Sequence, residues 1–160
     1  MKAVLLSIQP KYCELIASGK KTIEVRKTSP KIDTPFKCYI YCTIGNGVKG
    51  DYLVPSGIQC GKVIGEFVCN KIDGGYEYGK GSPLYGWHIT DLKIYEKAKE
   101  LSEFYTANWS LPCEHKKRGF NMDFCMAYEN GSHFCKQLNC NKKRLTRPPK
   151  SWCYVENLGE

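Results

Sequence analysis

A short stretch near the amino terminus combines basic and acidic side chains at a spacing suited to ligand chemistry. Residues 19–26 are Gly-Lys-Lys-Thr-Ile-Glu-Val-Arg, so Glu24 and Arg26 follow closely behind Lys21. Lysine and arginine can contact phosphate, arginine through two parallel hydrogen bonds. Glutamate can orient the arginine or accept a hydrogen bond from a base amino group. Charged groups gathered beside a core strand therefore indicate a polar cleft.

The polar and apolar residues of this stretch alternate, and a period of two predicts a half-buried strand over residues 22–27. Ile23 and Val25 are predicted to point into the core, which leaves Glu24 and Arg26 together on the other face. A structural interpretation stays open beside the functional one. An exposed ion pair of this kind contributes only about 0–1 kcal/mol to stability, and its lysine neighbour would be solvated.

A second group of potential ligands lies within residues 105–145, about forty residues of weak periodicity that we interpret as an insertion. The expected set is Cys113, Cys125, Cys135 and Cys140, with His115 or His133 as substitutes. Zinc takes four nitrogen or sulfur ligands, and it can order a segment too polar to fold alone. The spacing contains no C-x-x-C knuckle, so a loop with free thiols is the alternative. We hypothesise a structural zinc ion here and expect no required cofactor.

The other six cysteines lie in apolar patterns and are predicted to be small core residues. They are Cys13, Cys38, Cys42, Cys60, Cys69 and Cys153. Ten cysteines is a high count for a cytoplasmic chain of this size, and in a reducing compartment such thiols are usually buried, metal-bound or catalytic rather than paired.

The composition is that of a globular protein. The chain has 160 residues, of which 42% are hydrophobic, so we expect one domain over 1–160. No apolar run approaches about 18 residues, and the apolar start is too short for a signal peptide, which indicates a cytoplasmic protein without a membrane partner. The net charge of +8 permits a polyanionic partner. Residues 112–150 contain nine Lys or Arg and only three Asp or Glu, so the excess of positive charge lies mainly in the last third of the chain.

Local patterns predict several short strands and one early helix. Pro10 suits the first turn of a helix, Gly19 suits its end, and Gly65 marks a bulge. The expected strands are 3–8, 22–27, 36–43, 62–72, 87–95 and 151–155; the helix is 10–18; 98–104 is a short helix or turn; 44–59 and 74–86 are loops. These elements favour a mixed α+β fold, a small β-barrel with a helix after the first strand and an irregular insertion before the last.

The spacing G-x-K-x-x-E-x-R, formed by Gly19, Lys21, Glu24 and Arg26, resembles the signature of the ASCH domains, a PUA-like family associated with RNA. The tail Arg-Pro-Pro-Lys-Ser-Trp-Cys-Tyr-Val at 147–155 is similar to the closing strand of small ASCH proteins of bacteria and their phages. The resemblance covers about residues 3–104 and 145–156 and leaves out the insertion.

This resemblance implies a PUA-like barrel with a cleft between barrel and helix, where RNA or a modified nucleotide binds. The motif residues Lys21, Glu24 and Arg26 would line the cleft. Lys80 is expected at its rim, and Trp87 is one of several aromatic residues able to stack on an unpaired base.

Two alternatives remain open. Some relatives are amidohydrolases that deacetylate acetylcytidine with a lysine, a threonine and a glutamate, and others are ribonucleases. Lys21 matches the lysine, Glu24 replaces the threonine, and Glu66, in a core strand, is the positional candidate for the second acid. The third possibility is a protein-interaction module of phage or mobile-element origin that docks an acidic protein partner. The oligomeric state is not determined by these patterns.

Overall fold

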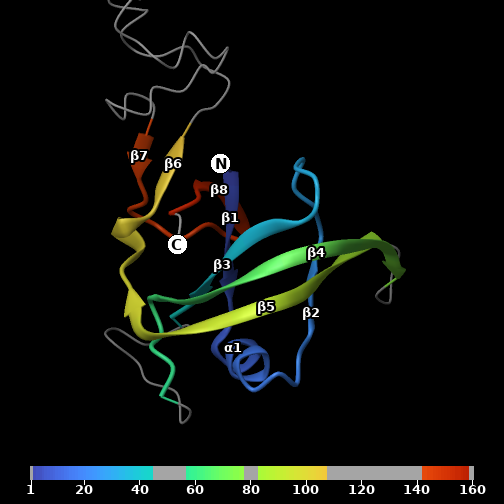
Figure 1. The fold of residues 1–160 in the computed structure, drawn as a ribbon, viewed down its shortest axis with the longest axis horizontal. Coiled ribbons are helices and arrows are strands. Elements are labelled where there is room, and N and C mark those ends of the chain that lie inside the picture. The colour runs from blue at the N-terminus through green and yellow to red at the C-terminus, as the bar shows by residue number, and fades with distance from the viewer. Residues whose placement is uncertain (1, 45–56, 78–82, 108–141, 159–160) are drawn as a thin grey trace, which may run out of the picture.

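A six-stranded sheet forms the body of the molecule. The computed structural model describes residues 2–44, 57–77, 83–107 and 142–158 (Figure 1). The sheet has the order β2-β5-β4-β3-β1-β8, with β1 and β3 parallel and the other neighbouring pairs antiparallel. Its strands are β1 (Lys2–Ile8), β2 (Ile23–Arg26), β3 (Phe36–Cys42), β4 (Val63–Glu77), β5 (Pro83–Lys99) and β8 (Trp152–Glu156).

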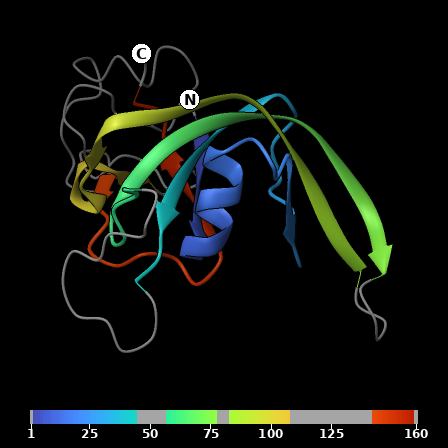
Figure 2. The same ribbon diagram turned by 90° about the horizontal axis from the view of Figure 1, so that it is seen from below.

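One helix, α1 (Pro10–Ala17), joins β1 to β2, close to its predicted bounds. Gly19 has φ +72°, a left-handed conformation that glycine adopts without steric cost, and its N–H caps the carbonyl of Ile16 at 2.9 Å. The long strands β4 and β5 curve over α1 (Figure 2). Within the described ranges, no helix combines the length and the apolar character that a membrane span requires.

The sheet has an apolar layer on each face. On the side of α1, the residues of β1 that point inward pack with Cys13 and Ile16 of the helix and with Trp87 of β5. On the opposite side, the alternate residues of β1 pack with Tyr39 and Phe104. Strand β1 is therefore buried on both faces, which explains its nearly continuous apolar run.

The described strands do not close into the predicted barrel. The strand order leaves β2 and β8 as the two edges, and side chains bridge them where a backbone ladder would be needed. The indole Nε1 of Trp152 donates to Oγ1 of Thr28 at 3.0 Å. The main-chain N–H of Lys31 donates to the hydroxyl of Tyr154 at 2.6 Å. We call this junction the seam. It has β8 on one side, and β2 together with residues 27–31 on the other.

The loop predicted over residues 74–86 is wrong over 74–77 and 83–86, because both flanking strands extend into it; residues 78–82 lie outside the described residues. Strand β4 continues to Glu77 and β5 begins at Pro83, so the strands predicted over 62–72 and 87–95 were too short. Gly74 pairs with Tyr85 across the hairpin, and four register shifts absorb irregularities along the pair. The bulky partners of β5 keep this glycine-rich stretch extended.

The predicted insertion begins and ends with two short paired strands. Strand β6 (Tyr105–Ala107) runs antiparallel to β7 (Lys142–Arg144), and residues 108–141 lie outside the described part of the chain. A 3-10 turn over Leu101–Glu103 precedes β6, where a short helix or turn was expected.

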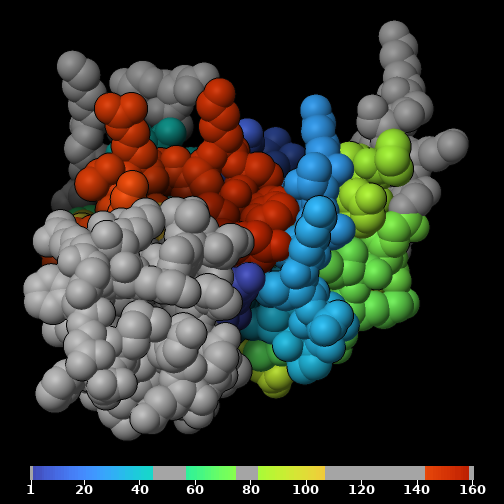
Figure 3. Space-filling view, turned by 90° about the horizontal axis from the view of Figure 1, so that it is seen from above, coloured from blue at the N-terminus to red at the C-terminus, as the bar shows by residue number. Residues whose placement is uncertain are grey.

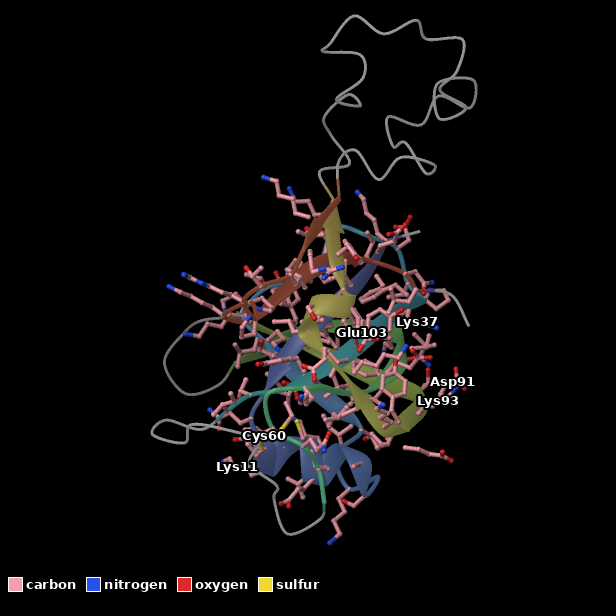
Figure 4. All side chains as sticks on the ribbon, turned by 90° about the vertical axis from the view of Figure 1, so that its left-hand side faces the viewer. Lys11, Lys37, Cys60, Asp91, Lys93 and Glu103 are labelled. Carbon is pink, nitrogen blue, oxygen red and sulfur yellow. The ribbon has the colours of Figure 1, made fainter. Side chains whose placement is uncertain are left out.

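The six cysteines predicted to be core residues are confirmed. Five are buried and Cys153 is half-buried. The Sγ atom of Cys42 lies 3.6 Å from that of Cys60, which Figure 4 labels near α1. Burial raises the pKa of the Cys60 thiol to about 12, and it raises the pKa of the Cys69 thiol to about 11.

These pKa values predict slow alkylation in the folded state. At pH 8, iodoacetamide should modify Cys60 and Cys69 far more slowly in native protein than in urea-unfolded protein, because the thiolate is the reactive form. Peptide mass spectrometry over time measures each site. The unfolded chain ionises first, so the free energy of unfolding should also fall as the pH rises from about 9 towards 11. Equal native and unfolded rates would contradict the assignment.

The predicted bulge at Gly65 is confirmed and generates a second prediction. The register shifts between Val63 and Gly65, and a Cβ added at Gly65 would lie 2.5 Å from the main-chain oxygen of Lys93. Gly65→Ala should therefore lower the free energy of unfolding by about 1–3 kcal/mol. Gly74→Ala is the control, since its Cβ would meet only the Tyr85 ring at 3.6 Å. Urea unfolding compares the two, and equal stabilities would refute the steric argument.

Candidate functional site

Two charged residues of the motif, Glu24 and Arg26, lie on the inner face of the edge strand β2. Glu24 is directly opposite Trp87 of β5, and it is only 6% exposed. The prediction that Ile23 and Val25 face the core is wrong: Val25 is 36% exposed and Ile23 is half-buried. Arg26 pairs with Glu24 inside, and a period of two then turns their apolar neighbours to the other face.

Arg26 connects β2 to two other parts of the sheet. Its Nη2 contacts Oε1 of Glu24 at 2.9 Å and donates to the carbonyl of Ser7, at the end of β1, at 2.8 Å. Its Nη1 lies 3.4 Å from the carbonyl and 3.3 Å from the hydroxyl of Ser151, just before β8. The side chain is 12% exposed, and this burial lowers the pKa of Arg26 while the Glu24 carboxylate opposes the shift.

Lys21 completes the ionic group from the more accessible side. Its Nζ lies 3.4 Å from Oε2 of Glu24 and 5.4 Å from the centre of the Tyr12 ring on α1. The Lys21 side chain is 20% exposed, against 8% for Glu24. The main-chain N–H of Lys21 donates to Leu15 at 2.9 Å, so the end of the helix fixes its position.

Trp87 lies on β5 directly opposite Glu24, and its side chain is fully buried. Its ring contacts Phe36 at 5.8 Å and Trp152 at 5.9 Å between centroids. We call Lys21, Glu24, Arg26 and Trp87 the polar cluster. Three of its buried atoms have no hydrogen-bond partner in the described part of the chain: Glu24 Oε2, Arg26 Nε and Trp87 Nε1. Buried polar atoms are normally paired, so this concentration is unusual.

Glu66 is not brought together with the polar cluster. It pairs with Tyr39 across β3 and β4, and Tyr39 belongs to the apolar layer on the face opposite α1. There the Glu66 carboxylate accepts from Tyr95 at 2.6 Å and from Lys37 at 3.2 Å. Partial burial favours the neutral acid, but these hydrogen bonds outweigh it and lower the pKa of Glu66.

Several predicted site residues lie outside the described residues. They are Lys80, Cys113, Cys125, Cys135 and Cys140, and the two histidines offered as substitute ligands, His115 and His133. Among residues 2–44, 57–77, 83–107 and 142–158, no group of three or more His, Cys, Asp or Glu side chains is arranged to hold a metal ion. The zinc hypothesis stays a prediction about the insertion.

The sequence reasoning did not identify three residues that shape the site. Ser7 and Ser151 accept the hydrogen bonds of Arg26, and Trp152 packs against Trp87. Ser7 carried a signal, because it is the one polar residue of a buried Val-Leu-Leu-Ser-Ile run. Ser151 and Trp152 belong to the tail that resembles a closing strand, but that pattern did not place them at the site, since their importance depends on which strand lies beside β1.

The chain is similar to one protein family and to solved structures. A family model described as ASCH domain matches residues 6–111. A serine-to-alanine mutant of the ASCH protein from Zymomonas mobilis has a TM-score of 0.53 at 14% identity, covering 96% of this chain and 88% of that one. The ASCH protein of the same bacterium has a TM-score of 0.46 at 18% identity, covering 62% and 73%. No curated protein matches the chain. At these identities the structural likeness concerns the fold alone.

The geometry of Arg26 predicts a large effect on stability. Arg26→Ala should lower the free energy of unfolding by about 3–5 kcal/mol, because it leaves the buried Glu24 carboxylate without its closest cation. Arg26→Lys should recover only part of this loss, since lysine cannot make the forked contacts. Val25→Ala, on the exposed face of the same strand, is the control and should cost less than about 1 kcal/mol. Urea unfolding measures both variants. A similar loss of unfolding free energy for Val25→Ala and Arg26→Ala would contradict the structural role of Arg26.

Proposed function

The chain belongs to the ASCH domain family, PUA-like proteins thought to bind RNA, and on this premise we propose that it binds RNA or a modified nucleotide at the polar cluster. The observation that carries the proposal is the set of three buried polar atoms that have no hydrogen-bond partner among the described residues, of which Glu24 Oε2 is in an ion pair with Lys21. The Glu24 oxygen can accept from an amino group, and the two N–H groups can donate to a carbonyl or ring nitrogen. A nucleobase offers both kinds of partner on one edge.

The cations of the cluster would have different roles in this proposal. Arg26 already contacts Glu24, Ser7 and Ser151, which leaves its Nε as the group to meet a ligand. Lys21 has the most exposed side chain of the three charged residues in the cluster, and it would contact the phosphate or the sugar of the ligand. Glu24 then has two roles, because it pairs with both cations and presents Oε2 to the base.

A hydrolase is the second candidate, and the 3.4 Å contact between Lys21 and Glu24 is the observation in its favour. In the amidohydrolases that the motif resembles, a second acid takes part. Glu66 is engaged on the opposite face by Lys37 and Tyr95, so it does not supply that second acid beside Lys21. Binding without conversion of the ligand is the function we propose.

The proposal predicts that Lys21 controls binding. A mixed pool of nucleosides, acetylcytidine included, and short RNAs is incubated with the protein at low salt, and both retained and converted species are analysed. Retention should fall about tenfold in Lys21→Ala, because one charge-assisted contact of about 1.5 kcal/mol is lost. Lys11→Ala is the matched control. Lys11 lies on α1, and its Nζ is 4.7 Å from the centre of the same Tyr12 ring that Lys21 approaches. Its retention should change less than about threefold.

Each outcome has a distinct meaning. Conversion of acetylcytidine or cleavage of RNA, lost in Lys21→Ala, would select the hydrolase. Wild-type retention by a folded Lys21→Ala variant would rule out the polar cluster as the binding site. If the wild-type protein retains nothing, the cluster is structural or serves a protein partner.

A further inference from the structure

The segment that leads into β8 is strongly basic and exposed. Residues 142–150, which we call the strap, contain Lys142, Lys143, Arg144, Arg147 and Lys150, and no acid. The last four of these side chains are exposed. Among the described residues, Lys143, Arg147 and Lys150 take part in no ion pair. Such a run of uncompensated charge is suited to a polyanion.

The carboxyl-terminal end of the strap is held beside the polar cluster through Ser7 and Ser151. The hydroxyl of Ser7 donates to the carbonyl of Pro149 at 2.6 Å, and the main-chain N–H of Ser7 donates to the carbonyl of Ser151 at 2.9 Å. Arg26 reaches the same Ser151. The red carboxyl-terminal segment accordingly lies beside the light-blue part of the chain on one face of the molecule (Figure 3). A ligand in contact with the strap is therefore close to the cluster.

Aromatic rings continue from the cluster towards the surface along the seam. Trp87 contacts Trp152 at 5.9 Å, and Trp152 contacts Tyr154 at 5.4 Å between centroids. Trp87 is fully buried, whereas Trp152 and Tyr154 are half-buried and so partly accessible. We call these three rings the aromatic row. Trp152, the middle ring of this row, comes two residues after Lys150, the last cation of the strap.

We propose that the strap and the aromatic row together bind a single strand of RNA several nucleotides long, with one base at the polar cluster. This inference rests on the proposed function and specifies its ligand as an oligonucleotide rather than a free nucleoside or mononucleotide. Cations that follow the backbone beside rings that stack on bases are the usual surface for single strands. A duplex keeps its bases stacked and paired, so it cannot use the rings. An acidic peptide would use the cations alone.

The test measures binding of a labelled hexaribonucleotide of mixed sequence, with four comparison probes. These are a nucleoside monophosphate, a blunt RNA duplex of the same length, inorganic polyphosphate and hexaglutamate. The hexamer should bind at least tenfold more tightly than each of them at low salt. Only nucleic acid should quench the fluorescence of Trp152. The signal of Trp152 is identified as the part of the quenching that disappears in the Trp152→Phe variant.

Two matched variants locate the contact. Arg147→Ala/Lys150→Ala removes two charges from the strap and should reduce the slope of log affinity against log salt by about 1.4, two lost phosphate contacts on a single strand. Hexamer affinity should fall towards that of the mononucleotide. Lys93→Ala/Lys97→Ala removes the same charge from exposed positions on β5 and should leave both quantities unchanged. Lys93 lies well away from the strap in Figure 4.

The outcomes separate this inference from the proposed function. Equal binding of hexamer and mononucleotide, unaffected by the strap variant, would overturn the inference and leave the nucleotide site in place. Equal binding of hexamer, polyphosphate and hexaglutamate would show a general polyanion surface and overturn the assignment to RNA. Failure of both nucleotide probes to bind would remove the proposed function, and this inference with it.

Discussion

Burial of the Glu24 carboxylate against Arg26 is the interaction on which the rest of the arrangement depends. A charge removed from water is tolerated only with close partners, and Arg26 supplies one while taking its own from Ser7 and Ser151. This single guanidinium therefore joins the short edge strand β2 to the end of β1 and to the entry of β8. Its hydrogen bonds to Ser7 and Ser151 connect strands where the curved sheet leaves its two edges without a backbone ladder. It also places polar atoms in the interior beside Trp87.

Much of the fold was predictable, because its signals are local. Pro10 and Gly19 bound the helix within one or two residues, and the apolar runs of β1 and β3 have nearly the expected ends. The glycines at 74 and 75 misled the prediction, since tertiary pairing with β5 overrides their weak strand preference. Barrel closure could not be predicted either. It depends on whether β2 meets β8 through backbone or side chains, a relation between residues more than a hundred positions apart.

The candidate site was predicted in composition but not in orientation. Glu24 and Arg26 were expected on the face opposite the core, as follows from the rule that the apolar residues of an alternating strand, here Ile23 and Val25, point inward. Their reciprocal pairing reverses that rule, and the apolar Val25 is exposed instead. Glu66 was placed correctly in a core strand, but the strand's two faces are not distinguished by its apolar pattern. Its partner Tyr39 lies on the face away from α1, so the acid is separated from Lys21 by the thickness of the sheet.

The position of β8 has a consequence for synthesis of the protein. Strand β1 is made first, yet one of its edges pairs with β8, about 110 residues after the end of β3. At about 5–20 residues per second, that edge waits roughly 5–20 s on the ribosome for its partner. Unpaired apolar edges are templates for aggregation. Completion of the sheet is thus a late event that follows emergence of the carboxyl-terminal strand. A nascent chain stalled in the insertion would expose β1 as an unpaired edge of the sheet.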